Sequence, residues 1–427
     1  MSSLSIPHQK PRLYYGWIMV VALAITEVIS WGILYYTFSI FITPMQESEG
    51  WSRSALTGAF SLALLMNGIA GTYMGRLLDR HGARWLMTLG SCAALLLILA
   101  WSAVTSLTGL YLVWAGIGVA MAMVLYEPAF AVIATWFIEK RGKAITLLTF
   151  IGGLASVIFI PLSNRLIEAH GWREALVILA IILGSVTIPI HALFLRRHPH
   201  DLGLLPDGVI AGEKLHHTIH LERSIPLKIA MEHASFWWLT GAFMLSTFTG
   251  VAMMIHLSPY LVDNGYSTTF AASAAGAVGL MSLPGRLVFT WIGDYLPRRW
   301  VTAFVFGLQP CGFLAMVTIS GESGIMLGIA LFGLAFGALT PARAALIAEY
   351  YGSASYGTIN GMLAFFVTFA RAVAPVSTGI AHDAVHSYDP VLWGLVFISL
   401  AASFILPLAK PIPHAKEELS TIEITAG

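Results

Sequence analysis

Three arginines lie inside apolar stretches of the second half of the sequence: Arg286, Arg343 and Arg371. Arg286 belongs to the run from Leu280 to Arg299 and precedes Asp294 by eight residues. At a rise of about 1.5 Å per helical residue, Arg286 would lie about 12 Å deeper in a membrane than Asp294. A guanidinium at that depth stays charged and can hold a carboxylate through two parallel hydrogen bonds. Arg286 and Arg371 therefore predict a binding site for an organic anion.

Two acidic residues lie inside apolar stretches of the first half, Glu27 and Glu127. Burial favours the neutral form of a carboxyl group, so either residue could load and release a proton. The alternative for each acid is a permanent ion pair with an arginine of the second half, Arg286 included. We expect Arg343 to have a structural role, paired with a nearby acid such as Glu349 or with the charged turn at Asp294.

Several uncharged polar residues accompany these charges. Tyr126 stands beside Glu127, just before a proline, and its hydroxyl group could donate a hydrogen bond to an anion. Further candidates for substrate contact are Tyr35, Asn67, Ser282 and Asn360, each of which could equally form a hydrogen bond between helices. If Arg286 and Arg371 face one cavity, they repel each other unless an anion enters, which would suit an exchanger or a dicarboxylate carrier.

The composition is that of an integral membrane protein. Of 427 residues, 57% are hydrophobic and 11% are charged, and the mean hydropathy is +0.78; soluble domains carry about 25% charged residues. Apolar runs of about 20 residues indicate helices and exclude a barrel of short alternating strands. No basic run suits nucleic acid, and no nucleotide loop, metal-ligand spacing or nucleophile arrangement stands out. We therefore expect no enzyme, cofactor or metal.

The apolar runs predict an all-α protein with twelve membrane-spanning helices. The predicted spans are 14–43, 54–75, 85–105, 109–137, 144–168, 173–195, 235–262, 268–292, 300–320, 324–350, 357–382 and 389–409. A polar linker, 196–234, separates a bundle of six helices at 1–195 from a second bundle at 235–427, which ends in a short tail. Most of the 23 lysines and arginines lie in the termini and after even-numbered spans, which predicts cytoplasmic termini. Short termini without a targeting segment favour a prokaryotic inner membrane.

The two halves share a weak repeat at an offset of about 214 residues. Pro161-Leu-Ser lies over Pro375-Val-Ser, and the turn from Asp79 to Trp85 resembles the turn from Asp294 to Trp300. Because proline and the charged turn recur together, we expect two related bundles that rock against each other during transport.

The turn after the second predicted span, GRLLDRHGAR from Gly75 to Arg84, resembles the G-x-L-x-D-R-x-G-R-[KR] signature of the major facilitator superfamily. Glycine permits close helix approach, and an aspartate there can pair with a helix end. The residues expected to have structural or gating roles are Gly75, Asp79, Arg80, Gly82, Arg84, Asp294 and Arg343.

Within that superfamily the first half resembles the monocarboxylate transporter family and the oxalate:formate antiporter group. The matching positions include Gly16-Trp17, Gly50-Trp51-Ser52, Trp136-Phe137, Gly152-Gly153 and Gly171-Trp172-Arg173. The resemblance implies two pseudo-symmetric six-helix bundles and alternating access for small organic anions, often with proton coupling. It also matches Arg286 to the family's substrate-binding arginine.

Two departures from the monocarboxylate pattern concern the proton. Ser282 stands where animal members have an aspartate, and Tyr35 stands where they have a lysine. If a proton is carried, Glu27 or Glu127 must carry it.

The sequence therefore predicts a monomeric secondary carrier of monocarboxylates or dicarboxylates in the lipid bilayer, working by proton symport or anion exchange. One alternative is proton-coupled efflux of a drug-like or amphiphilic compound, for which the arginines would be structural. Another is a receptor or regulator that does not transport, which the short loops and tail disfavour.

Overall fold

The computed structural model describes residues 14–208, 225–293 and 295–411, so the predicted gating residue Asp294 lies outside the described residues. The N-terminal half, α1–α8, is helical throughout. Its helices are α1 Tyr15–Trp31, the π-helix η1 Gly32–Tyr36, α2 Phe38–Glu49, α3 Arg53–His81, α4 Ala83–Ser102, α5 Leu107–Val124, α6 Tyr126–Trp136, α7 Arg141–Gly152 and α8 Ala155–Phe194.

Two short 3₁₀ turns and a small helix lie in the described part of the linker: η2 Pro199–Leu202, η3 Pro206–Gly208 and α9 Leu227–Glu232. The C-terminal half, α10–α15, follows. Its helices are α10 Ala234–Asp263, α11 Thr268–Gly293, α12 Arg298–Thr318, α13 Glu322–Tyr351, α14 Tyr356–Val385, α15 Asp389–Ile405 and the 3₁₀ turn η4 Leu406–Leu408.

In the described ranges, ten helical segments are long and apolar enough to cross a membrane. One of them, Arg141–Phe194, contains two predicted spans, since its backbone breaks at Gly171 with φ 79°. The remaining predicted span is α11, whose apolar part is Ser273–Phe289. These segments account for the twelve predicted spans, and the prediction of an all-α membrane fold is confirmed.

Two predicted spans of the N-terminal half are interrupted. The span at 109–137 breaks at Leu125, so that Pro128 falls in the first turn of α6, where a missing N–H group costs nothing. The first span contains one π-helical turn at Gly32–Tyr36 before it continues as α2. Single π turns inside helices are frequent at functional sites.

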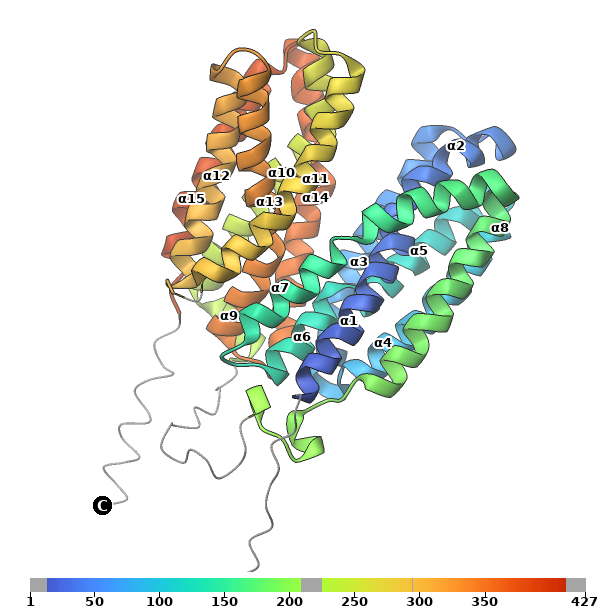
Figure 1. Ribbon diagram of the computed structural model, residues 1–427, viewed down its shortest axis with the longest axis vertical. Helices are drawn as coiled ribbons and strands as arrows, with labels where there is room; N and C mark the ends of the chain where they lie inside the picture. Colours follow the sequence, from blue (N-terminus) through green and yellow to red (C-terminus); the bar gives the residue numbers. More distant parts are fainter. Residues whose placement is uncertain (1–13, 209–224, 294, 412–427) are drawn as a thin grey trace, which may run out of the picture.

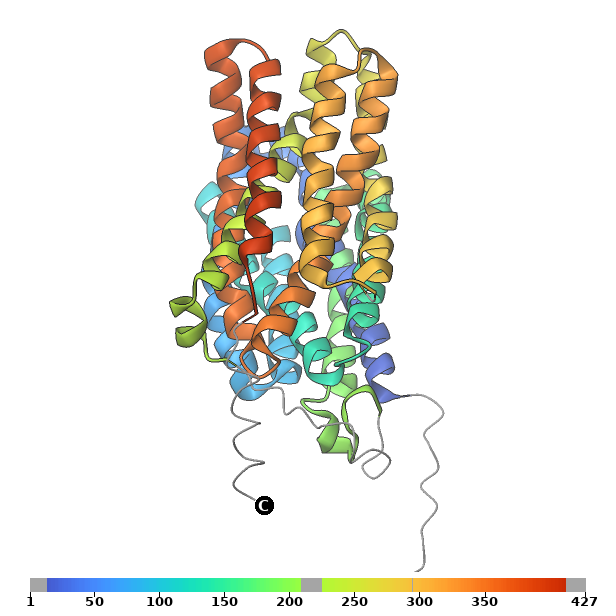
Figure 2. The same ribbon diagram turned by 90° about the vertical axis from the view of Figure 1, so that its left-hand side faces the viewer.

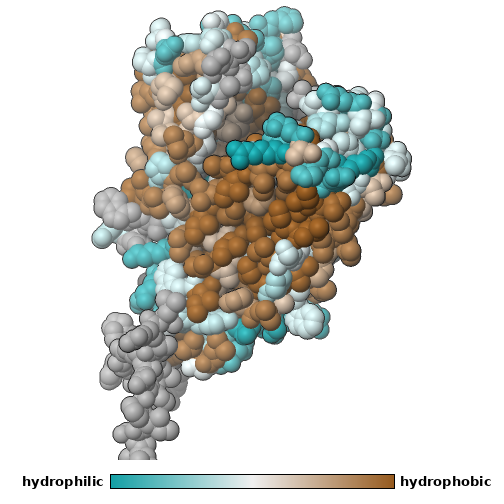
Figure 3. All heavy atoms as spheres, turned by 45° about the vertical axis from the view of Figure 1, so that its right-hand side comes forward, coloured by the Kyte–Doolittle hydropathy of each residue, from teal (hydrophilic) through white to brown (hydrophobic). Residues whose placement is uncertain are grey.

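The two halves stand side by side and diverge toward the upper end in Figure 1. Figures 1 and 2 place the start of α1 and the segment that follows α8 at the lower end, and the end of α15 at the lower end of the C-terminal half. Figure 3 shows an apolar band across the N-terminal half, with hydrophilic residues above and below it, as expected for a surface that faces lipid. We call the lower end the closed end and the upper end the open end.

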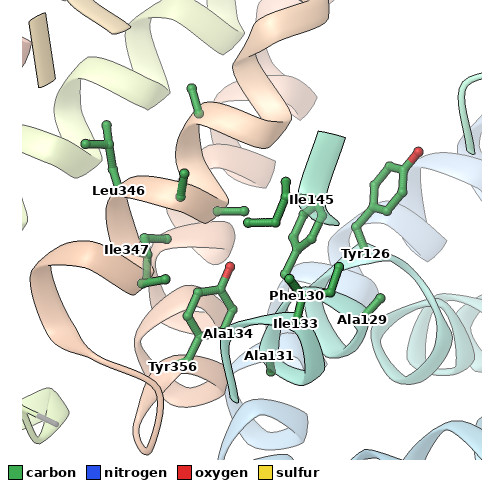
Figure 4. Packing of buried hydrophobic residues seen from close by; sticks show 14 of the residues in the cluster. Tyr126, Ala129, Phe130, Ala131, Ile133, Ala134, Ile145, Leu346, Ile347 and Tyr356 are labelled. Carbon is green, nitrogen blue, oxygen red and sulfur yellow. The ribbon is translucent and has the colours of Figure 1, made fainter. Parts of the chain in front are cut away.

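The hydrophobic cores explain these names. One cluster combines residues of both halves, including Phe130 and Ile145 with Ile347 and Tyr356, and Figure 4 shows these side chains meeting between the bundles. Two further clusters are confined to one half each: one spans residues 28 to 183 and the other residues 252 to 396. The halves thus share a core at the closed end and have separate cores toward the open end.

Candidate functional site: a central cavity between the halves

A cavity of about 190 Å³ lies between the two halves, at the level where the shared core ends. Its walls come from both bundles. The lining residues are Trp31, Tyr35, Tyr36, Asn67, Leu125, Tyr126, Glu127, Gly152 and Gly153 from the N-terminal half, and Phe243, Thr247, Val251, Arg286, Phe336, Leu339, Thr340, Arg343, Val367, Thr368 and Arg371 from the C-terminal half. All three predicted intramembrane arginines therefore line one cavity.

Arg286 reaches from α11 across the cavity to the N-terminal half. Its Nη1 group donates a hydrogen bond to the carbonyl oxygen of Thr149, in the last turn of α7. The C-terminal end of a helix carries partial negative charge, so a cation is favourable there. Arg286 also interacts with the hydroxyl group of Tyr126. A Cβ atom at Gly153, the residue that caps α7, would lie 2.5 Å from Nη1, so the absence of a side chain there makes room for the guanidinium.

Arg371 is half-buried on α14 and lines the same cavity. Within the described part of the chain, its guanidinium makes no hydrogen bond or ion pair. Tyr36, in the π turn, lies close enough to interact electrostatically with both Arg371 and Arg286. Two guanidinium groups of the C-terminal half thus lie near one tyrosine of the N-terminal half.

Arg343 and Glu127 form an ion pair between the halves. The Nη2 atom of Arg343, on α13, lies 2.9 Å from Oε1 of Glu127, on α6. The side chains are 10% and 27% exposed. Among the described residues, the acid that pairs with Arg343 is therefore Glu127 and not the predicted Glu349, which pairs with Arg298 at 3.2 Å. With Glu127 as the acid in the lining, three arginines leave the cavity walls with a formal charge of +2.

Glu27 lies behind the cavity wall, fully buried in α1. Neither carboxyl oxygen has a hydrogen-bond partner within the described residues. The indole group of Trp31, which does line the cavity, and the carboxyl group of Glu127 lie close enough to interact with it. An ionised carboxylate without a hydrogen-bond partner is costly in such a buried place.

The uncharged candidates separate into two groups. Tyr35 and Asn67 line the cavity, as Tyr126 does. Ser282 is buried and its hydroxyl donates to the carbonyl oxygen of Gly279 at 2.7 Å. Asn360 is fully buried outside the cavity, and within the described residues its amide makes no hydrogen bond. The structure thus brings three of these five side chains to the cavity.

Sequence reasoning missed five cavity residues that can donate or accept hydrogen bonds: Trp31, Tyr36, Thr247, Thr340 and Thr368. Thr368 precedes Arg371 by three residues and so shares its helix face, and this spacing could have predicted that Thr368 lines the cavity. The sequence does not predict that Tyr36 lines the cavity, because in a regular helix its side chain would point away from that of its neighbour Tyr35. The π turn adds a residue at this place and brings both tyrosines to the lining.

The signature turn at 75–84 lies at the closed end and joins the halves. Asp79 accepts hydrogen bonds from the N–H groups of Gly357 and Thr358, both at 2.9 Å, and from the Thr358 hydroxyl at 2.6 Å. These groups belong to the first turn of α14, where an anion is favourable. A Cβ atom at Gly75 would lie only 2.1 Å from the carbonyl oxygen of Gly357, so α3 and α14 meet backbone to backbone.

The other residues of the turn shape the chain reversal. Gly82, with φ 85°, ends α3 and begins α4. The carbonyl oxygen of Arg80 accepts a hydrogen bond from Arg197 at 2.8 Å. Arg84 is exposed and faces a second hollow between α4 and α8.

Two bundles of membrane-spanning helices around a charged cavity, sealed at one end, define a membrane transporter. The chain belongs to the Major Facilitator Superfamily, whose profile matches residues 23–375. Members of this family are transporters and not enzymes, and they bind small molecules within lipid membranes.

Two relatives and one solved structure show the range of similarity. The chain is 23% identical to monocarboxylate transporter 13 of Bos taurus, over 95% of each chain. It is 22% identical to the oxalate:formate antiporter of Oxalobacter formigenes, over 88% of each chain. The crystal structure of the E. coli fucose:proton symporter FucP matches with a TM-score of 0.71 at 13% identity, covering 93% of this chain and all of that one. The resemblance to monocarboxylate and oxalate:formate carriers is thus confirmed at low identity.

Proposed function

We propose that the protein is a secondary active transporter of small carboxylates. The observation that carries the proposal is the positive charge of the cavity, where Arg286 and Arg371 face the same volume and Glu127 is occupied by Arg343. A carboxylate between Arg286 and Arg371 would remove their repulsion and gain charge-assisted hydrogen bonds. The printed names of the relatives, a monocarboxylate transporter and an oxalate:formate antiporter, support the same substrate class.

The contact between Arg286 and Thr149 supports a role in conformational change. This guanidinium, from the C-terminal half, binds the end of α7 in the N-terminal half. A bound carboxylate would compete with the Thr149 carbonyl for the same donors, and a charged acceptor forms the stronger hydrogen bond. Substrate binding would thereby exchange a contact between the halves for a contact with the substrate.

Glu27 is the residue that we propose to carry a proton, should transport be proton-coupled. Its carboxyl group is buried without a hydrogen-bond partner among the described residues, whereas Glu127 is held in an ion pair. Tyr126, Tyr36 and Thr368 would complete the contacts to the substrate from the cavity walls.

We further propose that the closed end faces the cytoplasm, as the distribution of basic residues predicts, in a prokaryotic inner membrane. The open end would then face outward, and the cavity would receive substrate from outside. The protein would work as a monomer, since each bundle contributes its own half of the cavity.

Uptake of labelled monocarboxylates and dicarboxylates into proteoliposomes, with and without a pH gradient, tests this proposal. The Arg286→Lys variant keeps the charge but loses the planar fork, so we expect uptake to fall by about tenfold or more at low substrate concentration. Arg165→Lys, an exposed position away from the cavity, is the matched control. Glu27→Gln should remove any stimulation by the gradient and leave exchange of internal for external substrate intact.

Three outcomes would contradict the proposal in different ways. Unchanged uptake by the Arg286→Lys variant would remove that residue from the binding site. No carboxylate uptake, but extrusion of an apolar fluorescent amphiphile, would favour the efflux alternative. Binding of a carboxylate without transport in the intact protein would favour a receptor.

A further inference from the structure

A second hollow lies at the closed end on the outside of the N-terminal half, away from the central cavity. It holds about 220 Å³ between the α3–α4 turn and the segment that follows α8. Its lining residues are His81, Gly82, Arg84, Trp85, Leu195, Arg196, Arg197 and Asp201. Figure 1 shows the lower ends of α4 and α8 beside the linker at this place.

The hollow is strongly basic. Three arginines and one aspartate give its lining a formal charge of +2 with His81 neutral. The aspartate is engaged in its own 3₁₀ turn, because Asp201 accepts from the backbone N–H group of His198 at 3.0 Å and lies 3.5 Å from His200. The arginines are therefore not neutralised by an acid of the lining.

Donors of these arginines remain available. Arg84 is exposed, and its side chain makes no hydrogen bond or ion pair with the described residues. Among the described residues, Arg196 donates through Nη1 alone, to the carbonyl oxygens of Leu193 and Leu195. Arg197 donates through Nη2 to carbonyl oxygens at the end of α3.

The start of α4 adds N–H groups to the same hollow. Its N-cap is Gly82, which has no side chain to accept from the first turn. The first N–H groups of a helix lack partners within the helix and favour an anion. Gly82 and the first-turn residues Arg84 and Trp85 all border the hollow.

The surface beside the hollow is apolar and exposed. Trp85 is 67% exposed and Leu89, one turn along α4, is 55% exposed. On the neighbouring end of α8, Leu193 and Phe194 are also exposed. In a membrane protein such side chains contact lipid, and a tryptophan at a helix end lies at the level of the headgroups. A molecule with an anionic head and apolar chains matches both parts of this surface.

We propose that this hollow binds the phosphate group of an anionic phospholipid, with the acyl chains lying along α4 and α8. The phosphate would lie at the first turn of α4 and accept hydrogen bonds from Arg84, in that turn, and from Arg196, which follows α8. Basic pockets between helices on the cytoplasmic side are suited to such headgroups. Inorganic phosphate offers the same anionic oxygens but gains nothing from the apolar surface, so we assign the site to lipid.

Native mass spectrometry of the full-length protein in detergent tests this site. We offer equimolar phosphatidylglycerol and phosphatidylcholine with identical chains and expect phosphatidylglycerol to be retained preferentially. At about 1 kcal/mol per arginine, Arg84→Gln should lower this preference about fivefold, and Arg84→Gln with Arg196→Gln should lower it further. Arg76→Gln, an exposed arginine near the same end of α3 but outside the hollow, should leave the preference unchanged.

Five results decide the matter, with gel filtration confirming that each variant is folded. Equal retention of both lipids by the parent protein would overturn the proposal, as would a full preference in the Arg84→Gln variant. Equal loss in the Arg76→Gln variant would show nonspecific attraction and would also overturn it. In a second arm, inorganic phosphate is added in millimolar excess: persistence of phosphatidylglycerol supports the lipid assignment, and complete displacement shows a free-anion site instead.

Discussion

The closed end and the open end are built from the same helices but hold the two halves in opposite ways. At the closed end, α3 meets α14 backbone to backbone, Asp79 binds the first turn of α14, and one hydrophobic core crosses between the halves. Toward the open end, each half has its own core. The conformation is therefore determined by contacts at one end, with the charged cavity at the boundary.

This difference separates two kinds of residue. Contacts that cross between the halves must break and reform in each cycle, so they act on the balance of conformations. Contacts within one half persist in both conformations, so they act on folding. Substitutions at the closed end should shift accessibility and transport, while comparable changes at the open end should change only the stability of one bundle.

The largest effect is expected from Gly75→Ala. The added Cβ atom would lie 2.1 Å from the Gly357 carbonyl oxygen, so α3 and α14 must separate. We expect transport to fall by about tenfold or more and the closed end to widen. The distance between spin labels at Arg76→Cys and Ala354→Cys, in a background without Cys92 and Cys311, measures the widening.

Gly379→Ala is the matched control for that substitution, on α14 but toward the open end. A Cβ atom there would meet only His256, of the same half, at 3.9 Å. Transport and label distance should stay as in the parent protein. An equal loss in both variants would mean that the closed end is not where the conformation is set.

Breaking the ion pair between the halves should have the next largest effect. Glu127→Gln leaves Arg343, which is 9% exposed, without its counterion. Loss of one partner of a buried ion pair lowers the free energy of unfolding by about 3–5 kcal/mol. Because Glu127 lines the cavity and is less buried, we expect a smaller loss of about 1–3 kcal/mol. Thermal unfolding in detergent should report the loss.

The double variant Glu127→Gln with Arg343→Gln sharpens this test, since it removes both charges. It should recover most of the stability, because no buried charge is left unpaired. A double variant as unstable as the single one would show that the residues contribute through packing and not through their charges.

Asp79→Asn should have a smaller effect confined to the closed end. The amide keeps one acceptor oxygen for the N–H groups of α14 but loses the negative charge and the second acceptor oxygen. An acceptor of this kind at the start of a helix contributes about 1 kcal/mol of stability. We expect the ratio of separated to closed conformations to rise about fivefold. The distribution of distances between the spin labels at positions 76 and 354 measures this ratio. Arg80→Gln, at the next residue, should not shift it, and an equal shift there would point to loss of charge in general.

The sequence was sufficient for the fold because lipid leaves the chain few options. Twelve apolar runs and the turn at Gly75 predict the helices and the family; the structure confirms the helices, and the match to the family profile confirms the family. It was also sufficient to place Arg286 and Arg371 in transmembrane helices, and both line the cavity, although their role as substrate ligands stays a prediction.

Pairings between distant residues were beyond the sequence. Glu127 and Arg343 are 216 positions apart, and their partnership depends on how one bundle is rotated against the other. Gly32, the first residue of the π turn, lies directly against the ring of Phe159, a contact that no pattern along the chain predicts. The sequence predicts which charged residues lie in the membrane. Their partners can be identified only from the arrangement of the two halves in the structure.

The smallest effect is expected from Tyr356→Phe, in the core that crosses the closed end. The hydroxyl group of Tyr356 is buried and has no hydrogen-bond partner among the described residues, while its ring packs between the halves (Figure 4). Removing an unpaired buried hydroxyl should stabilise the closed end by at most about 1 kcal/mol. The melting temperature should rise slightly and the rate of substrate release through this end should fall by less than about fivefold, as single-turnover efflux from proteoliposomes would show. A loss of stability would mean that the hydroxyl is solvated in the intact protein, and the seal at the closed end would then be wetter than its apolar neighbours suggest.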